Sequence, residues 1–238
     1  MAAAIEAHGG LDAWFGSGTL AFTYDYQPVE GVRRRSHQTV DVLGARAYHE
    51  ISHPVQGKLA WDGAKAWMKL AEGQNFAARF WALTPYYFVG MPFVLSDPGV
   101  NLELSEDDPE DAGFPEGTPV VRATFDPGTG DAPDDYYVLY LDADSHRVVG
   151  LRYVVSYAPF MKDGMKHKPE KLIVYEDVEP AGPLQLARTH TTYAYGSGKR
   201  GERVTRATIE DLEVGVPFDA SALAMPEGGQ IDTSLDGR

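Results

Sequence analysis

Apolar and polar residues alternate with a period of two along most of the chain, which is the pattern of strands buried on one face. Leu20, Phe22 and Tyr24 show it first. Alternating, β-branched or aromatic runs then recur over 34–43, 45–52, 59–61, 66–70, 100–104, 119–125, 135–141, 148–157, 171–178, 185–195 and 203–214. Turn residues separate these runs, as Asp62-Gly63 does in a tight hairpin. The sequence therefore predicts about a dozen antiparallel strands, and a sheet of that size curls or closes.

Helical spacing interrupts the alternation twice. Residues 2–8 favour a helix that Gly9-Gly10 ends, and residues 11–15 favour one more turn. The second interruption, 75–93, reads NFAARFWALTPYYFVGMPF and is apolar nearly all round. Thr84 and Pro85 suit the N-cap and the first position of a helix, so we expect two helices in this segment. That composition is unusual for a helix that packs by only one face.

The whole pattern predicts a mainly β (α+β) fold, in which a curved antiparallel sheet or half-barrel wraps on helices at its concave side. We find no linker, no break in composition and no internal repeat. The chain is therefore expected to form a single domain over 1–238, in which 227–238 is a flexible tail.

Composition and charge narrow the possible functions. Apolar residues make up 43% and charged residues 24%, as in ordinary soluble globular domains. The absence of Cys excludes disulfides, thiol catalysis and thiolate metal sites. A net charge of −14 repels phosphate backbones and anionic lipid head groups, so we expect no nucleic-acid partner. The sequence contains no run of about 20 apolar residues, so it predicts no transmembrane helix.

Residues 49–53, HEISH, match the H-E-x-x-H pattern of zinc peptidases. That chemistry needs both histidines on one face of a helix. Pro54 follows at once, and the residues upstream alternate like a strand, in which Glu50 points away from His49 and His53. We therefore expect a strand end with exposed histidines, and no cofactor. A metal-dependent hydrolase, for which Glu72 is a conceivable third ligand, stays open, as does adventitious metal binding by His49 and His53.

The aromatic segment 75–93 is the main candidate for function. It either fills the concave side of the sheet as a core plug, or lines a pocket for an apolar ligand. Two tryptophans on the preceding hairpin are expected to face the same cavity. The candidate ligand-binding residues are Trp61, Trp67, Phe76, Phe80, Trp81, Tyr86, Tyr87, Phe88, Met91 and Phe93.

Several short motifs carry a family resemblance. AIEAHGGLDAW at 4–14, YLDAD at 140–144 before VVGL at 148–151, and FDASAL at 218–223 resemble the outer-membrane lipoprotein-sorting (LolA-like) group. FVGMPFVLSDPGVNLE at 88–103 is similar to an uncharacterised envelope relative rather than to LolA itself. The resemblance implies a half-barrel wrapped on helices, an apolar cavity that receives acyl chains, and a periplasmic or envelope-associated location. MAAAIEAHGG shows no basic region of a signal peptide, and one interpretation is that Met1 replaced an export signal.

The sequence and this resemblance together favour a non-enzymatic envelope protein. Its partner would be an apolar small molecule or a lipid acyl chain, held between sheet and helices, with lipid or lipoprotein carriage as one form of the function. An envelope protein is a further candidate partner. The alternatives are the HEISH hydrolase and an interaction scaffold whose cavity is filled.

Overall fold

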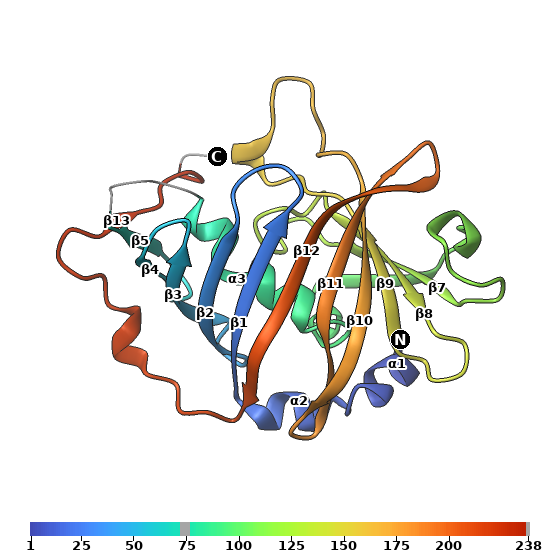
Figure 1. Ribbon diagram of the computed structural model, residues 1–238, viewed down its shortest axis with the longest axis horizontal. Coiled ribbons are helices and arrows are strands. Elements are labelled where there is room, and N and C mark those ends of the chain that lie inside the picture. Colours follow the sequence, from blue (N-terminus) through green and yellow to red (C-terminus); the bar gives the residue numbers. More distant parts are fainter. Residues whose placement is uncertain (72–76, 237–238) are drawn as a thin grey trace.

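The computed structural model describes residues 1–71 and 77–236, and its strands form one open, curved antiparallel sheet (Figure 1). The thirteen described strands are β1 (Thr19–Pro28), β2 (Arg34–Asp41), β3 (Arg46–His53), β4 (Gly57–Trp61), β5 (Ala66–Leu70), β6 (Val100–Leu104), β7 (Val120–Phe125), β8 (Tyr136–Leu141), β9 (Val148–Tyr153), β10 (Lys171–Ala181), β11 (Leu184–Gly196), β12 (Lys199–Val214) and β13 (Gln230–Ile231). Each predicted run overlaps a strand, so the predicted fold class is confirmed.

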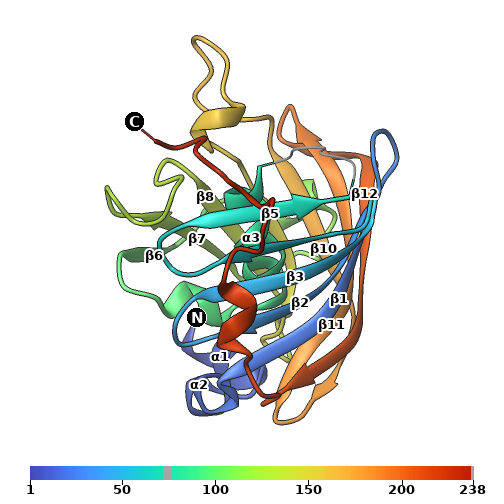
Figure 2. The ribbon, with the colours of Figure 1, turned by 90° about the vertical axis from the view of Figure 1, so that its left-hand side faces the viewer.

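The helices are few and short. They are α1 (Ala2–Ala7), α2 (Leu11–Ser17) and α3 (Ala78–Val89), with the 3-10 turns η1 (Phe93–Ser96), η2 (Pro109–Ala112), η3 (Ala158–Phe160) and η4 (Ala220–Leu223). Figure 2 shows α1 and α2 at one end of the curved sheet and α3 inside its curve. The predicted placement at the concave side is therefore confirmed for α3.

The strand order explains why α3 lies there. Across the sheet the order is β13-β5-β4-β3-β2-β1-β12-β11-β10-β9-β8-β7-β6, so β1 and β12 meet in the middle. The strands β5 and β6 follow each other in sequence but lie near opposite edges of the sheet. The chain crosses from one to the other through α3 and η1, and this crossing runs over the concave face (Figure 1).

Residues 78–89 form one continuous helix, and the prediction of two helices is wrong. Pro85 lies inside α3 instead of beginning a second helix. The Thr84 hydroxyl donates to the Phe80 carbonyl at 2.5 Å, which is a common arrangement for Thr inside a helix. Pro85 and Tyr86 are buried in the concave face. The tertiary packing of this face thus outweighs the local preference of proline for a first turn.

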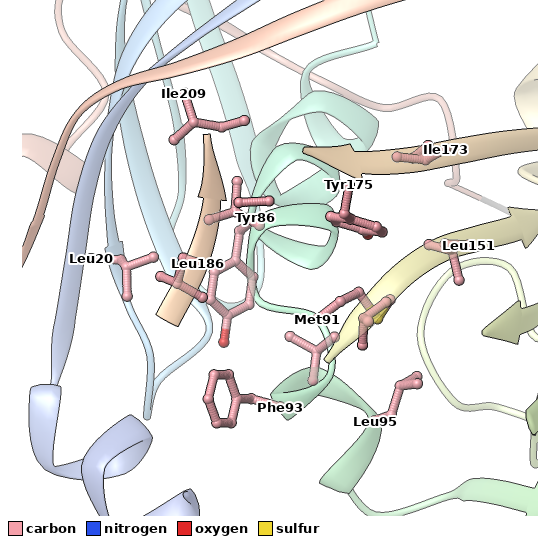
Figure 3. Close-up of a cluster of buried hydrophobic side chains, with 14 of the residues drawn as sticks. Leu20, Tyr86, Met91, Phe93, Leu95, Leu151, Ile173, Tyr175, Leu186 and Ile209 are labelled. Atoms are coloured by element: carbon pink, nitrogen blue, oxygen red, sulfur yellow. The ribbon is translucent and has the colours of Figure 1, made fainter. Parts of the chain in front are cut away.

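The core fills the concave side around the end of α3 (Figure 3). Trp14 of α2 stacks on Phe93, with ring centroids 4.7 Å apart, and on Tyr86 at 5.9 Å. A Cβ atom at Gly90 would lie 3.0 Å from the Trp14 ring and 2.9 Å from Val94. Gly90 therefore lets the chain leave α3 closely against Trp14, and this contact joins the N-terminal helices to α3.

His8 of the AHGG motif has a structural role. Its Nδ1 donates to the Gln185 carbonyl at 2.6 Å, and its Nε2 accepts from the Val148 backbone N–H at 3.1 Å. The imidazole is almost fully buried, and burial lowers its pKa. His8 therefore ties the end of α1 to the starts of β9 and β11.

The segment after β12 wraps around one edge of the sheet, and β13 lies in the part of it that is predicted as a flexible tail, 227–238. After β12, Phe218 packs on Tyr48 on the convex face, with centroids 5.4 Å apart. β13 then pairs with β5. Beyond it, the Asp232 carboxylate accepts from the Arg79 backbone N–H at 2.9 Å. The chain thus passes from the convex face over the edge to the beginning of α3, as Figure 2 shows.

Candidate functional site

One pocket of about 160 Å³ opens between α3 and the wall formed by β6, β7 and β8, and we name it the α3 pocket. Its lining comes from α3, from the segment around η1 and from the loop between β7 and β8. The lining residues are Arg79, Phe80, Leu83, Thr84, Tyr87, Val94, Asp97, Val100, Phe125, Thr129, Gly130, Asp131, Ala132, Asp135, Tyr137 and Tyr157.

The spacing along α3 explains how one helix serves two surfaces. Phe80, Leu83, Thr84 and Tyr87 follow the i, i+3, i+4, i+7 pattern of one helical face, and all four line the α3 pocket. Ala78 and Ala82, on another face, are buried against β3, β4 and β5. One face therefore packs on the sheet and the other lines the pocket, which accounts for the helix being apolar nearly all round.

Aromatic rings supply most of the apolar lining. Phe80 lies 5.2 Å from Tyr157, and Phe125 lies 5.3 Å from Tyr137, measured between ring centroids. Burial raises the pKa values of the Tyr87, Tyr137 and Tyr157 phenols, so these hydroxyls remain neutral near pH 7. The pocket therefore presents neutral rings with a few hydroxyl groups.

Three carboxylates and one guanidinium also line the α3 pocket. Arg79 Nε is 2.8 Å from Asp131 Oδ2, and the guanidinium lies 3.6 Å from the centroid of the Trp61 ring. Asp135 Oδ1 accepts from the Ser156 backbone N–H at 2.5 Å, while burial raises the pKa of Asp135 to about 6. Burial also raises the pKa of Asp97. The lining is thus acidic on balance.

The structure separates the residues that the sequence groups together. Phe80 and Tyr87 line the α3 pocket, and Trp61 lies at its rim beneath Arg79. Tyr86, Met91 and Phe93 belong to the core (Figure 3). These three residues therefore fill the concave side of the sheet as a core plug, which is the alternative to a pocket lining that the sequence leaves open.

Trp81 and Phe88 lie near the α3 pocket but not in its lining. Trp81 packs on Tyr26, with centroids 5.6 Å apart, and borders a much smaller hollow of about 20 Å³ near His49. Phe88 packs on Tyr153 at 5.1 Å. Phe76, like Glu72, lies outside the described residues.

Trp67 lies on the opposite face of the sheet from α3. Its neighbours in β5, Ala66 and Met68, pack with α3, so the alternation of the strand turns Trp67 to the convex face. There its indole N–H donates to the Leu223 carbonyl at 2.7 Å. We therefore leave Trp67 out of the candidate site.

The sequence interpretation missed most of the far wall. Phe125 and Tyr137 lie in strands whose alternation predicts which face of the sheet each side chain is on. It does not predict which residues lie opposite them across the cavity. Asp131 and Asp135 lie in a segment whose composition is typical of a solvated loop. The sequence pattern that could have indicated this wall is the apolar alternation at Tyr137, Leu139 and Leu141, which lie on the inward face of β8.

HEISH lies in β3, and Glu50 is exposed while His49 and Ile51 are buried, so the predicted opposition of Glu50 and His49 is confirmed. The prediction that His49 is exposed is wrong. It pairs with Gln38 and Leu59 in a buried row on the concave face, and its Nε2 donates to the Ala82 carbonyl at 3.0 Å. Burial lowers the pKa of His49 to about 4. Across 1–71 and 77–236, no group of three or more His, Asp or Glu side chains is arranged to hold a metal ion.

None of the helices described in 1–71 and 77–236 has the length and apolar character needed to span a membrane.

Comparison with protein-family models gives no match, and neither does comparison with curated protein sequences. Solved structures do match. A domain described as an outer membrane lipoprotein-sorting protein, from Vibrio parahaemolyticus, aligns with a TM-score of 0.53 at 12% identity, over 87% of this chain and 90% of that one. A LolA superfamily protein from Nitrosomonas europaea aligns with a TM-score of 0.54 at 8% identity, over 87% and 89%. The chain therefore has a LolA-like fold.

Proposed function

We propose that this protein is a non-enzymatic carrier or binding protein of the bacterial envelope, which holds a lipid or another apolar ligand in the α3 pocket. The observation that carries the proposal is the pocket itself. Aromatic and aliphatic side chains from α3 and from β6, β7 and β8 surround about 160 Å³ on the concave side of the sheet. Concave sites of this kind, mainly apolar with a few polar groups, are typical of small-molecule binding.

The volume limits what fits without movement. Engineered cavities of roughly 150 Å³ take up benzene, so the α3 pocket can hold a ring or a short stretch of chain. A complete acyl chain needs α3 to shift away from β6 and β7. Removing apolar surface from water would supply about 25 cal/mol per Å² toward that shift.

The start of α3 is the part whose contacts such a shift would change. Arg79 joins it to the loop between β7 and β8 through Asp131, and to the C-terminal segment through Asp232. Opening this side of the pocket breaks the ion pair between Arg79 and Asp131, whose side chains are only 17% and 27% exposed. We therefore propose that the ligand enters between α3 and the loop at 126–135.

The LolA-like fold supports the envelope location and the lipid-like nature of the ligand. One of the matched structures is named for lipoprotein sorting and the other for the LolA superfamily. A carrier also has to receive and release its ligand, so we propose an envelope protein as its macromolecular partner.

The proposal is tested with two matched substitutions on one edge strand. Val100 and Leu104 lie on the same face of β6, but only Val100 lines the pocket, while Leu104 is 84% exposed. We expect protein purified from bacteria to carry lipid in native mass spectrometry and to take up 1-decanol after delipidation. Val100→Trp should fill the pocket and lower 1-decanol affinity at least tenfold, and Leu104→Trp should not.

Thermal unfolding of both variants checks that the fold is kept. If the wild-type protein carries no lipid and takes up no 1-decanol, the proposed function is wrong. If Val100→Trp binds 1-decanol as the wild type does, the ligand site lies elsewhere.

A further inference from the structure

The α3 pocket combines aromatic faces with an excess of negative charge. Asp97, Asp131 and Asp135 line it, and Arg79 is the one cation among the described residues of its lining. Arg79 is already engaged, because its guanidinium pairs with Asp131 and stacks over Trp61. Two carboxylates therefore remain without a cation.

Asp97 and Asp135 are placed to act on a ligand. No ion pair involving either is found within 1–71 and 77–236. Asp97 follows η1, and Asp135 immediately precedes β8. After burial, the charge of Asp97 is the next cause that raises the pKa of the Tyr87 phenol, and the charge of Asp135 is the next cause for the Tyr137 phenol. Each of these two carboxylates, which have no ion-pair partner among the described residues, thus accompanies one of the aromatic rings that line the pocket.

Aromatic faces and carboxylates together form the chemistry that recognises ammonium groups. The face of a Tyr or Phe ring attracts a cation through its quadrupole, and quaternary ammonium ligands are commonly held in aromatic cages. Phe80, Tyr87, Phe125 and Tyr137 provide such rings in the α3 pocket. A carboxylate or phosphate head group would instead meet Asp97 and Asp135 at short range, in a partly desolvated site where repulsion is strong.

We infer that the α3 pocket selects alkylammonium amphiphiles, with the ammonium group between the aromatic rings and the carboxylates of Asp97 and Asp135, over amphiphiles that end in an anionic group. The alkyl chain lies along the aliphatic part of the lining, Leu83, Val94 and Val100. This inference rests on the proposed function and specifies the class of ligand.

The test compares ten-carbon probes that differ only at the polar end. Full-length delipidated protein is titrated by calorimetry at pH 8 with decyltrimethylammonium, 1-decanol and decanoate, all below their micelle concentrations. We expect decyltrimethylammonium to bind at least tenfold more tightly than 1-decanol, and decanoate to bind most weakly. Tetramethylammonium, which lacks the chain, should bind at least tenfold more weakly than decyltrimethylammonium.

A double variant and a charge-matched control separate the site from the general acidity of the surface. Asp97→Asn with Asp135→Asn should reduce decyltrimethylammonium affinity to that of 1-decanol, and Asn can still accept the Ser156 N–H bond. Asp134→Asn and Asp108→Asn, both exposed and outside the pocket lining, remove the same charge together and should change affinity less than twofold.

The outcomes distinguish this inference from the function on which it rests. If no ten-carbon probe binds, the proposed function fails. Equal binding of all three probes, or preference for decanoate, overturns the inference and leaves apolar ligand binding intact. An equal loss in the control variant also overturns it, because the effect would then come from net charge alone. If tetramethylammonium binds as tightly as decyltrimethylammonium, the ligand is a small ammonium compound and the amphiphile class is wrong.

Discussion

His190 and His49 are both buried on the concave side of the sheet, but they differ in hydrogen bonding. Neither ring nitrogen of His190 has a hydrogen-bond partner among the described residues, and the Tyr24 and Tyr175 rings lie 6.2 and 4.8 Å from its centroid. Burial lowers the pKa of His190 to about 3, so the imidazole is neutral. One of its nitrogens therefore carries a buried N–H without an acceptor.

Replacing His190 by Leu is expected to stabilise the protein. The substitution removes the unpaired polar group and keeps a similar volume, so we expect the free energy of unfolding at pH 8 to rise by about 1 kcal/mol. Urea denaturation followed by tryptophan fluorescence measures it. His49→Leu is the control of opposite sign, because it removes a bond to Ala82 and should lower the free energy of unfolding by about 1 kcal/mol. If both variants shift in the same direction, hydrogen bonding does not decide the difference.

For individual residues, the alternation correctly predicted which side chains of β3 lie on opposite faces, but it did not predict that His49 is buried. The opposition of His49 and Glu50 follows from the period of two. The burial of His49 depends on Ala82 of α3, which is 33 residues away in sequence. A strand pattern cannot show which of its faces a distant helix covers.

The element that organises the candidate site is α3. Its N-cap residue, Ala77, has no polar side chain, so the first backbone N–H groups of the helix need another acceptor. Asp232 supplies one from the C-terminal segment, at 2.9 Å from the Arg79 nitrogen. Its pKa is lowered despite burial, which alone would raise it, because Ser234 and the start of α3 donate hydrogen bonds to the carboxylate.

Removing this cap is expected to weaken the start of α3. Asp232→Ala should lower the free energy of unfolding by about 1 kcal/mol, the usual cost of losing an N-cap. Because the start of α3 borders the pocket, hydrogen exchange at residues 78–82 should also become faster. Asp236→Ala, at an exposed position of the same segment, is the control and should change neither quantity. Unchanged exchange in Asp232→Ala would show that the helix does not depend on this contact.

The sequence predicted the presence of this helical segment but not its form. Thr84-Pro85 favoured a helix start, because local propensity does not include the burial of Pro85 and Tyr86. The sequence also could not predict the cap of α3, because Asp232 lies in a segment whose composition favours disorder. The pocket lining combines i, i+3, i+4, i+7 positions of α3, which a sequence can reveal, with a far wall that requires knowledge of the topology.

For the whole molecule, the number of strands and the curvature of the sheet were predictable, because period-two alternation and sheet length determine them. The order in which the strands pair across the sheet was not predictable. The pairing of β1 with β12 joins residues that lie near opposite ends of the chain, and the pairing of β13 with β5 joins the tail to an edge. Contacts of such sequence separation leave no local pattern. The crossing of α3 over the concave face follows from these pairings.

Three buried histidines make the stability of the whole molecule sensitive to acid. Burial lowers the pKa values of His8, His49 and His190, to about 4 and about 3 for the last two. The unfolded chain, with histidine pKa values near 6.5, then binds more protons than the folded one. Stability that is present above pH 6.5 is therefore lost as the pH falls toward the folded pKa values. Asp135 acts in the opposite direction below pH 6, because its folded pKa of about 6 is raised, and it offsets part of this loss.

We expect the free energy of unfolding to fall by on the order of 2 kcal/mol between pH 7 and pH 5, before most carboxylates titrate. Urea denaturation midpoints at half-unit pH steps measure this decrease, and His190→Leu should make it shallower because one of the three histidines no longer titrates. The slope at pH 5 to 6 is decisive, because carboxylate pairs such as Asp25 with Arg33 have lowered carboxylate pKa values and act only at more acid pH. A midpoint that is constant down to pH 5, or a slope unchanged in His190→Leu, would show that these histidines do not limit acid stability.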